Sequence, residues 1–378
     1  MLVQNNINPG LLGLISSFII IQEKHSPSCS EKGQNHALAH FALISTRIIH
    51  SLLAAATEIR AILPFSLRLR ECFYRFFENS KLSLLVFFCV FYILLIMIDL
   101  HVHSTASDGQ YTPTELVQMA KEKGFSAIAI TDHDTVSGLE EGKRTAEDLG
   151  IIFVPGIEID IDRPNCEFHL LGLGLQEISS ELNTLIASLQ EKRLERNMQI
   201  VQKMNDAGIN ATVEEIQAEF PNQVLGRPHF ASWLEKNKIV KHKQDAFDKY
   251  LGRGRPWFVE KDGAQLDEAI FAIKKSGGLP VIAHPFSLYL SWKNLDAELE
   301  NLKQRGVSGV EAYHSGSKPS QCSRLEELAK KHGFFVTAGS DFHGEKVHPD
   351  RSLGRTCAKR KIDDRFYFEE LLPALKQV

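Results

Sequence analysis

The sequence lacks the features of a disulfide-stabilised protein and of a general nucleic-acid binder. Its six cysteines, at positions 29, 72, 89, 166, 322 and 357, form no CxxC pair and no regular spacing. They predict unpaired thiols in a reducing compartment rather than a disulfide framework. The formal net charge of −4 provides no basic field that would hold long nucleic acid. Any contact with nucleic acid is therefore expected to be local, and duplex DNA is not an expected partner.

The first 96 residues contain no Asp and no Trp, which sets them apart from the rest of the chain. They lead into an almost unbroken apolar run, residues 82–98, which is preceded by Lys81 and followed by Asp99. The run has the length of a short membrane-spanning helix, and basic residues lie on its N-terminal side. A single-pass membrane anchor is therefore one interpretation. It leaves no linker between the bilayer and Asp99, and a strand of the following domain cannot begin inside hydrocarbon.

A second interpretation places the native start at Met97, so that residues 1–96 are upstream sequence translated from a misplaced start. Met97 opens the segment M-I-D-L-H-V-H-S, a natural beginning for a domain whose first strand starts at once. The missing linker favours this interpretation. A membrane partner is expected only if the N-terminal segment belongs to the mature protein, and otherwise we expect a cytoplasmic location.

From Asp99 onward, short apolar strands alternate with helices. At 378 residues the chain can bury at least one large core and has the length of two domains. Strands are predicted at 125–131, 151–159, 167–172, 278–283, 307–313 and 334–338, and helices at 112–123, 137–149, 293–305 and 320–332. The first helix begins with a capping box, in which Thr112 precedes Pro113 and Glu115. This alternation predicts an α/β barrel domain formed by residues 97–176 and 276–378.

Residues 177–275 break the alternation. They are charged, and their periodicity predicts helices at 180–206, 212–219, 229–238 and 243–251. We interpret this region as an inserted helical subdomain. Within it, Arg227, Arg253 and Arg255 lie beside Gly and Pro. Such arginines suit phosphate, because a planar guanidinium offers paired donors.

Side chains of metal-ligand type occur where the predicted strands end. His101 and His103 are two residues apart, so on a strand both imidazoles leave the same face. Asp108 follows in a polar segment, and Asp132-His133-Asp134 follows the next strand. The candidate ligands, in chain order, are His101, His103, Asp108, His133, Glu158, His169, His284, Asp341 and His343. Strand ends of this kind are where barrel enzymes keep their chemistry.

Each candidate alone is better explained by a core histidine or by an aspartate that caps the next helix. Jointly that explanation fails, because a core would have to bury six imidazoles and three carboxylates without a compensating charge. Imidazole and carboxylate ligands without thiolate favour Mn²⁺, Fe²⁺ or Zn²⁺ over Ca²⁺. Nine ligands are too many for one ion. The sequence therefore predicts two or three divalent metals at one rim of the barrel.

Five motifs resemble those of the PHP (polymerase and histidinol phosphatase) superfamily. They are I-D-L-H-V-H-S, I-T-D-H-D-T, P-G-I-E-I, V-I-A-H-P and G-S-D-F-H, and the resemblance covers nearly all of residues 98–350. The long helical insertion and the segment G-R-P-H-F at 226–230 are most similar to the bacterial 3′,5′-nucleoside bisphosphate phosphatases, a branch that includes a 5′-to-3′ exoribonuclease. Residues 1–96 have no counterpart in the family pattern, which also favours a start at Met97.

The resemblance implies a distorted seven-stranded β/α barrel, the PHP fold, with a trinuclear site for which Mn²⁺ is the first expectation and Fe²⁺ or Zn²⁺ the alternatives. It implies that His101, His103, Glu158 and Asp341 hold the more buried ion or pair and that the other five candidates complete the cluster. Asp132 and Asp134 are expected to orient imidazoles without being ligands. His314 is either a further partner or an exposed loop histidine, and the surface preference of histidine favours the exposed loop.

The resemblance also implies a substrate. We expect hydrolysis of the 3′-phosphate of nucleoside 3′,5′-bisphosphates, such as pAp to AMP, with trimming of short RNA from its 5′ end as a further activity. Arg227 and Arg253 are candidates for gripping the phosphate that does not react, and His229 is a candidate substrate contact. The alternatives are solvated surface arginines and a helix-start histidine without a role.

Two other functions compete with this one. A histidinol-phosphate-type phosphatase uses the same chemistry, but the arginine-bearing insertion argues against it. A non-catalytic metal-binding or membrane-tethered module is disfavoured by the complete ligand set and by the absence of a polymerase-like segment from the sequence. The sequence carries no signal for the oligomeric state.

Overall fold

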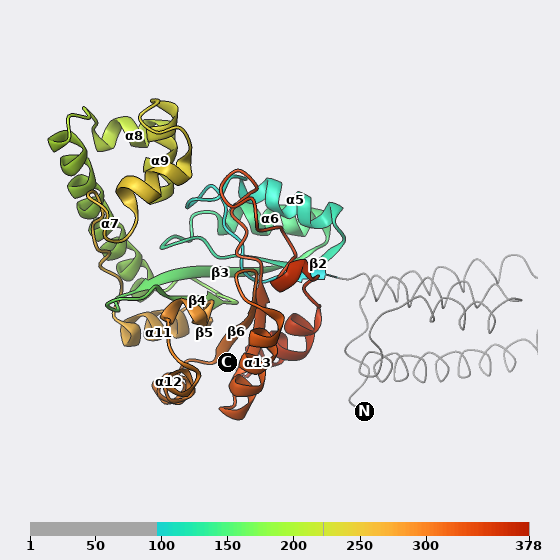
Figure 1. Ribbon diagram of the computed structural model, residues 1–378. Helices are drawn as coiled ribbons and strands as arrows, with labels where there is room; N and C mark the ends of the chain where they lie inside the picture. Colours follow the sequence, from blue (N-terminus) through green and yellow to red (C-terminus); the bar gives the residue numbers. More distant parts are fainter. Residues whose placement is uncertain (1–96, 222, 378) are drawn as a thin grey trace, which may run out of the picture. The chain divides into compact units, whose positions relative to one another are not determined.

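The structure is a computed structural model that describes residues 97–221 and 223–377 (Figure 1). Residues 1–96, and with them most of the apolar run 82–98, lie outside the described residues, so both interpretations of that segment stay predictions. Within the described ranges, no helix is long and apolar enough to cross a membrane. Cys166, Cys322 and Cys357, the three cysteines that the structure describes, are free thiols, as expected.

Seven strands form one sheet in which the spatial order follows the chain order. They are β1 Met97–Asp99, β2 Phe125–Ile130, β3 Ile152–Ile161, β4 Phe168–Leu173, β5 Leu279–Ile282, β6 Gly309–His314 and β7 Phe335–Gly339. The pairs β1–β2, β2–β3, β5–β6 and β6–β7 are parallel. Strand β4 is antiparallel to both of its neighbours, β3 and β5.

The sheet closes almost completely on itself. Just beyond β1 and β7, Val102 and Phe342 form a parallel bridge. The backbone N–H of His103 donates to the carbonyl of Phe342 at 3.0 Å, and the N–H of Asp341 donates to the carbonyl of His101 at 2.9 Å. The first and last strands therefore meet through the segments that carry candidate ligands. The predicted seven-stranded barrel is confirmed as a nearly closed mixed sheet.

Helices pack on the outside of the barrel. They include α5 Pro113–Glu122, α6 Leu139–Leu149, α11 Leu266–Lys275, α12 Trp292–Arg305 and α13 Pro319–Lys331. Helix α5 begins at the predicted capping box, since the Thr112 side chain accepts from the N–H of Glu115 and the Glu115 side chain accepts from the N–H of Thr112. Helix α6 ends at Gly150, whose φ of 63° is a left-handed conformation that glycine adopts without steric cost.

Short helical turns complete the C-terminal part of the domain. They are η2 Pro285–Leu288, η3 Cys357–Lys359, η4 Phe366–Leu371 and α14 Leu372–Leu375. The main core lies between the sheet and the surrounding helices, with Ile157, Leu171 and Val310 among its fully buried members. Burying a side chain of this size contributes about 1.5–3 kcal/mol to the free energy of unfolding. Because many such side chains are buried, the barrel holds the strand ends at its rim in fixed positions.

The region between β4 and β5 is helical. Its elements before α11 are α7 Ser180–Asp206, α8 Val213–Glu219, α9 Arg227–Lys236, α10 Lys243–Ala246 and η1 Phe247–Leu251. The first half of α7, through Leu182 and Ile186, belongs to the barrel core, whereas Ile200 and Met204 belong to a second core with Phe230. Figure 1 shows α8 and α9 beside the outer part of α7. Helix α7 therefore connects the two cores, and the apolar face of α11 also packs into the barrel core.

Candidate metal centre

All nine candidate ligands lie at one rim of the barrel. His101 and His103 follow β1, His133 follows β2, His284 follows β5, and Asp341 and His343 follow β7. Glu158 lies within β3, which ends two residues later than predicted. His169 lies near the start of β4, and the antiparallel direction of β4 brings that start to the rim where β3 ends, so that His169 pairs with Asp160.

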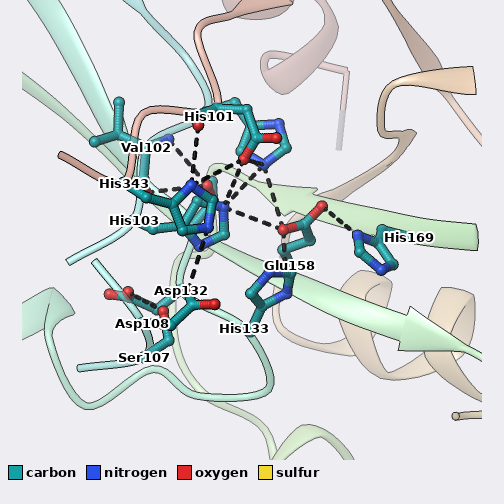
Figure 2. A network of polar contacts seen from close by, with 12 residues as sticks. His101, Val102, His103, Ser107, Asp108, Asp132, His133, Glu158, His169 and His343 are labelled. Carbon is teal, nitrogen blue, oxygen red and sulfur yellow. Dashed lines mark hydrogen bonds and ion pairs between the residues drawn. The ribbon is translucent and has the colours of Figure 1, made fainter. Parts of the chain in front are cut away.

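The donor atoms form three overlapping groups, each with its atoms within 4.8 Å of one another. The groups are His101, His103, Glu158 and Asp341; His103, Asp108, His133 and His343; and His133, Glu158 and His169. His284 joins through its Nε2, which lies 3.0 Å from Oε1 of Glu158. Figure 2 shows the side chains of His101, His103 and Glu158 pointing toward one another. The structure thus brings all nine candidates together.

Most of these imidazoles have one nitrogen on a fixed partner and the other directed into the cluster. Nδ1 of His101 is 3.0 Å from Oε1 of Glu311, while its Nε2 is 3.1 Å from Nε2 of His103. Nδ1 of His343 faces the carbonyl of Asp341 at 3.0 Å, and its Nε2 faces Oδ1 of Asp108 at 3.3 Å. Partners of this kind fix the tautomer, so that the inner nitrogen presents a lone pair.

Several buried polar atoms in the cluster form no hydrogen bond, although most of them face another member of the cluster at ion-pair distance. They are Nδ1 of His103, Oδ1 of Asp108, Nδ1 of His133, Oε2 of Glu158 and Oδ1 of Asp160. Buried polar groups are normally satisfied, and leaving one unsatisfied costs about 1–3 kcal/mol. Imidazole nitrogens and carboxylate oxygens that face one another in this way are suited to share divalent cations. The residues present therefore fit a multinuclear metal site without thiolate ligands.

The charges of the cluster are strongly coupled. Burial alone would raise the pKa of Glu158, but the imidazoles of His133, His101 and His169 hold it well below its usual range. Burial opposes protonation of His103, yet its contacts with Asp341 and Glu158 raise its pKa to about 9. Without a cation, the buried carboxylates are therefore balanced by protons on the imidazoles. A divalent cation would take the place of those protons.

Backbone strain accumulates at the same rim. Asp134, His284 and Asp341 have positive φ angles of 51°, 27° and 53° although none is glycine. Such conformations cost on the order of 1–3 kcal/mol each and persist only where the surroundings enforce them. Here they follow β2, β5 and β7: His284 and Asp341 are themselves candidate ligands, and Asp134 comes directly after the candidate ligand His133.

The two aspartates that flank His133 do not orient imidazoles, which differs from the prediction. Asp132 accepts hydrogen bonds from the N–H of Ser104 at 2.7 Å, the hydroxyl of Ser104 at 2.6 Å and the hydroxyl of Ser107 at 2.6 Å. It therefore holds the turn that carries Asp108. Asp134 accepts from the N–H of Asp160 at 3.2 Å and forms an ion pair with Arg193.

The interpretation of His314 as an exposed loop residue is wrong. His314 is the last residue of β6 and is buried, with its Nε2 at 3.2 Å from Oδ2 of Asp341. Its Nδ1 accepts the N–H of Gly316 at 3.1 Å. Because Gly316 donates to Nδ1, Nε2 carries the proton and donates it to Asp341. His314 therefore supports a candidate ligand.

Sequence reasoning missed Glu311, Asp160 and Arg351. Glu311 is 1% exposed in β6, and its second oxygen accepts the N–H of His284 at 2.8 Å. Oδ1 of Asp160 lies 3.1 Å from Nε2 of His169, and Arg351 forms an ion pair with Asp341. An acidic residue within an apolar strand was a usable signal for Glu311 and Asp160, because an unpaired carboxylate is not buried without a reason. No local pattern marked Arg351.

The three candidate substrate residues have other partners. The guanidinium carbons of Arg227 and Arg253 lie 5.4 Å and 5.8 Å from the centre of the Phe258 ring. Arg227 approaches Glu167 at 3.7 Å, and Arg253 pairs with Glu260 at 2.7 Å. His229 is buried and accepts the N–H of Gly226 at 2.9 Å on Nδ1, while its Nε2 lies 3.0 Å from Oε1 of Gln223. The structure brings the two arginines to one ring and places His229 in the cap of α9.

Comparisons with known proteins relate this chain to one family, to curated relatives and to a solved structure. The PHP domain family matches residues 99–252. A 5′-3′ exoribonuclease of Haemophilus influenzae is 34% identical over 245 residues, which are 65% of this chain and 89% of that protein. A 3′,5′-nucleoside bisphosphate phosphatase of Chromobacterium violaceum is 32% identical over 247 residues, 65% of this chain and 87% of that protein. A solved structure of a predicted metal-dependent phosphoesterase from Bifidobacterium adolescentis, 30% identical, matches with a TM-score of 0.64 over 73% of this chain and 95% of that chain.

Proposed function

Because this chain belongs to the PHP family and is a metal-dependent phosphoesterase, we propose that it removes the 3′-phosphate from nucleoside 3′,5′-bisphosphates. The conversion of adenosine 3′,5′-bisphosphate to AMP is the reference reaction. Trimming of short RNA from its 5′ end belongs to the same proposal, since the exoribonuclease and the bisphosphate phosphatase named above are similar to this chain to nearly the same degree. The convergence of nine ligand-type side chains with orphaned donor atoms carries the proposal.

The proposed cofactors are two or three divalent cations, with Mn²⁺ preferred over Fe²⁺ and Zn²⁺. His103, His133 and Glu158 each belong to two of the three donor groups, so the groups would hold cations that are close neighbours. Bound divalent cations supply two things to ester hydrolysis: a coordinated water with a pKa of ~7 and charge neutralisation on the phosphate oxygens. The third group, formed by His133, Glu158 and His169, completes the proposed site.

The protein's own part in the reaction is to hold these donors in fixed positions. Glu311 holds His101 and the backbone of His284, and Arg351 forms an ion pair with Asp341. The Arg351 charge contributes to a pKa of Asp341 well below its usual range, although burial acts in the opposite direction. Asp341 is therefore ionised at neutral pH and available as a ligand. None of these partners needs to move during the reaction.

Recognition of the phosphate that does not react is assigned, within this proposal, to Arg227 and Arg253. Both guanidiniums lie against Phe258, and a planar guanidinium can hold two phosphate oxygens at once. His229 contributes by capping the Gly226–Arg227 corner from which α9 begins. A histidinol phosphate carries no second phosphate, so arginines in this place favour a bisphosphate.

A substrate panel tests the proposal. The purified full chain is supplied with Mn²⁺ and offered adenosine 3′,5′-bisphosphate, a short 5′-phosphorylated RNA and histidinol phosphate under identical conditions. We expect phosphate release from the bisphosphate, shortening of the RNA and little reaction with histidinol phosphate. Preference for histidinol phosphate would establish a histidinol-phosphate-type phosphatase, and inactivity on all three substrates with full metal loading would support a non-catalytic metal-binding module.

We further propose that the protein works in the cytoplasm, where such nucleotides are found.

A further inference from the structure

The turn between α9 and α10 carries a run of positive charge. Residues 236–243, K-N-K-I-V-K-H-K, contain four lysines and one histidine but no acidic residue. Lys238 and Lys241 are exposed, and Lys243 is half-buried at the start of α10. We call these three residues the lysine surface. Because the whole chain has a formal net charge of −4, this surface is a local basic feature on an acidic protein.

The lysine surface has no carboxylate partner within the described ranges. Acidic side chains on the neighbouring elements pair with other lysines. Glu219 of α8 lies 2.9 Å from the ammonium of Lys236, and Asp245 of α10 lies 3.2 Å from that of Lys249. The protein therefore does not neutralise the positive charge of the lysine surface, which is available to an anionic partner.

The backbone at Lys238 would suit a different residue type. Its φ angle is 59°, in the left-handed region. Helix α9 ends at Lys236 and is capped by Asn237, so Lys238 occupies the position at which helices commonly have a glycine. A residue with a Cβ atom is disfavoured in this conformation. Local structure thus does not explain a lysine here, and its charge is the property that distinguishes it.

The start of α9 connects the lysine surface with the candidate metal centre. His229 lies in the first turn of α9, and burial lowers its pKa, while the charge of Asp108 raises it and that of Lys243 lowers it further. His229 is therefore within electrostatic reach of a candidate ligand on one side and of the lysine surface on the other. The N–H of Val224 donates to the carbonyl of Ala106 at 3.3 Å, which fixes the segment before α9 to the turn that leads to Asp108.

The lysine surface continues away from the centre along α9. This helix has ten residues and is therefore about 15 Å long, and Lys238 lies beyond its far end. Helix α10 packs back against α9, since Ala246 shares the second core with Phe230 and Leu234. The lysine surface therefore begins near His229 and extends outward to the end of α9.

Arg227 approaches a different sector of the rim. It is the first residue of α9, and its guanidinium lies 3.7 Å from Glu167, in the connection between β3 and β4. Asp108, by contrast, follows β1. A substrate phosphate at Arg227 and a chain that leaves past Asp108 would thus lie on different sides of the metal centre. The 5′ and 3′ parts of one RNA substrate require this arrangement.

We propose that the lysine surface binds the phosphate backbone of a single-stranded RNA, on the 3′ side of the bond that is hydrolysed. This inference rests on the proposed function and adds a binding site to its exoribonuclease part. Lysine suits this role because a flexible ammonium group contacts phosphate without reading a base. A nucleoside bisphosphate is too short to reach the lysine surface, which therefore acts only on longer substrates.

A length series tests the assignment. The full chain with Mn²⁺ is assayed on adenosine 3′,5′-bisphosphate, on a 5′-phosphorylated dinucleotide and on a 5′-phosphorylated RNA of about twelve nucleotides, a length typical of single-strand sites. At low salt, Lys238→Gln/Lys241→Gln is expected to lower kcat/KM for the long RNA ~5- to 20-fold, mainly through KM, because two phosphate contacts are lost. The two short substrates should react as they do with the wild type.

The salt dependence provides a readout that a merely structural defect would not change. Each phosphate contact on a single strand contributes ~0.7 to the slope of log affinity against log salt concentration. The slope of log kcat/KM for the long RNA should therefore become shallower by ~1.4 in the double variant. The matched control is Lys121→Gln/Lys123→Gln, which removes two exposed lysines at the end of α5. Equal slopes in the two double variants, or equal losses on the long RNA and the dinucleotide, would overturn the assignment.

A binding measurement separates failure of this inference from failure of the proposed function. Fluorescence anisotropy of the labelled long RNA is measured in EDTA, where hydrolysis does not occur. If the wild type does not shorten the RNA but binds it, and only the variant of the lysine surface weakens binding, the surface stands and the exoribonuclease activity is wrong. If the RNA is shortened and the two double variants bind it equally well, the lysine surface is rejected and the function stands. An RNA that is neither shortened nor bound rejects both.

Discussion

At the scale of single residues, a ligand imidazole needs a hydrogen-bond partner that fixes its orientation as well as the nitrogen that binds the metal. Glu311 uses both of its oxygens, one for Nδ1 of His101 and the other for the N–H of His284. The side chain is 1% exposed, so water cannot replace either contact. One buried carboxylate therefore fixes ligands from two different strand ends. Removing this carboxylate should therefore lower the metal affinity of the site, although all nine proposed ligands remain.

Glu311→Gln tests this dependence. A glutamine side chain keeps the shape but offers one carbonyl oxygen, so either His101 or His284 loses its acceptor. We expect Mn²⁺ affinity to fall ~10- to 100-fold, the usual effect of losing a partner that orients a ligand. Equilibrium dialysis followed by metal analysis measures it. Glu300→Gln on the exposed face of α12 is the control, and equal metal affinity in both variants would contradict the role of Glu311.

Residue chemistry also explains which parts of the site were predictable. His101, His103 and His133 lie in short polar motifs at strand ends, and such motifs are local in the sequence. Glu311 contacts a histidine 210 positions away, and Arg351 pairs with Asp341 through the return of a long loop. Contacts of this kind depend on how the barrel closes. Local spacing predicted the candidate ligands, whereas their supporting partners required the fold.

At the scale of elements, the direction of β4 decides whether His169 belongs to the centre. In a fully parallel barrel, a residue near the start of a strand lies at the rim opposite to the chemistry. Strand β4 is antiparallel to β3 and β5, and this reversal places His169 beside Asp160. The apolar alternation predicted a strand at 167–172 but carried no information on its direction. Direction is set by the short connection from β3, which makes a hairpin instead of a helical crossover.

The sequence predicted the bounds of the helices more accurately than it predicted the surfaces against which the helices pack. Helix α7 spans the predicted residues 180–206, because its ends are marked by the Ser179 cap and by the polar turn before Gly208. The periodicity did not reveal that the two halves of α7 enter different cores. An apolar face reports that a helix is buried but not against which neighbour. Helix α11, which was not among the predicted helices, also packs its apolar face against the barrel.

Close packing between β7 and the segment after β1 gives an element-scale prediction. A Cβ atom on Gly339 would overlap Cβ of His101 and lie 2.5 Å from Oε1 of Glu311. Gly339→Ala should therefore push β7 away from His101, lowering the free energy of unfolding by about 2–3 kcal/mol and reducing bound Mn²⁺. Urea unfolding and metal analysis measure the two effects.

Gly150→Ala is the comparison for Gly339→Ala. Gly150 has a φ of 63° with open space around the added Cβ, so only conformational strain of about 1 kcal/mol is expected there, with unchanged metal content. If both variants bind the same amount of metal, close contact at Gly339 does not hold His101 in place.

At the scale of the whole molecule, the barrel concentrates charge at one rim while its core is apolar. Buried carboxylates and imidazoles face one another there, and Arg193 of α7 forms an ion pair with Asp134 next to them. A chain that bound no cations would have no reason to keep this arrangement, because apolar side chains would stabilise it better. The stability of the metal-free protein should therefore depend strongly on the protonation of this rim.

The direction of that dependence follows from the pKa shifts. Carboxylates, acting against burial, raise the pKa of His101 well above 6.5 and that of His103 from 6.5 to about 9. A group with a raised pKa stabilises the fold fully below its unfolded pKa, and this contribution is lost as pH rises through the folded pKa. We expect the Tm of the metal-free protein to fall between pH 6.5 and 9, on the order of 5 °C. His284, whose pKa is lowered by burial, is already neutral in this range and contributes no change.

Saturating Mn²⁺ should abolish or reverse this decline. The cation needs the deprotonated imidazoles, so its affinity rises with pH over the same interval in which the metal-free fold loses its proton-dependent stability. Calorimetric scans in EDTA and in Mn²⁺ from pH 6 to pH 9 measure the two curves, and reversible unfolding is checked by repeat scans. The variant His332→Gln removes a part-buried ion pair with Asp296 at the end of α13, away from the cluster, and should leave the difference between the two curves in place. Parallel curves with and without Mn²⁺ would mean that protons and cations do not compete for the same imidazoles, and that the cluster is not where the metal binds.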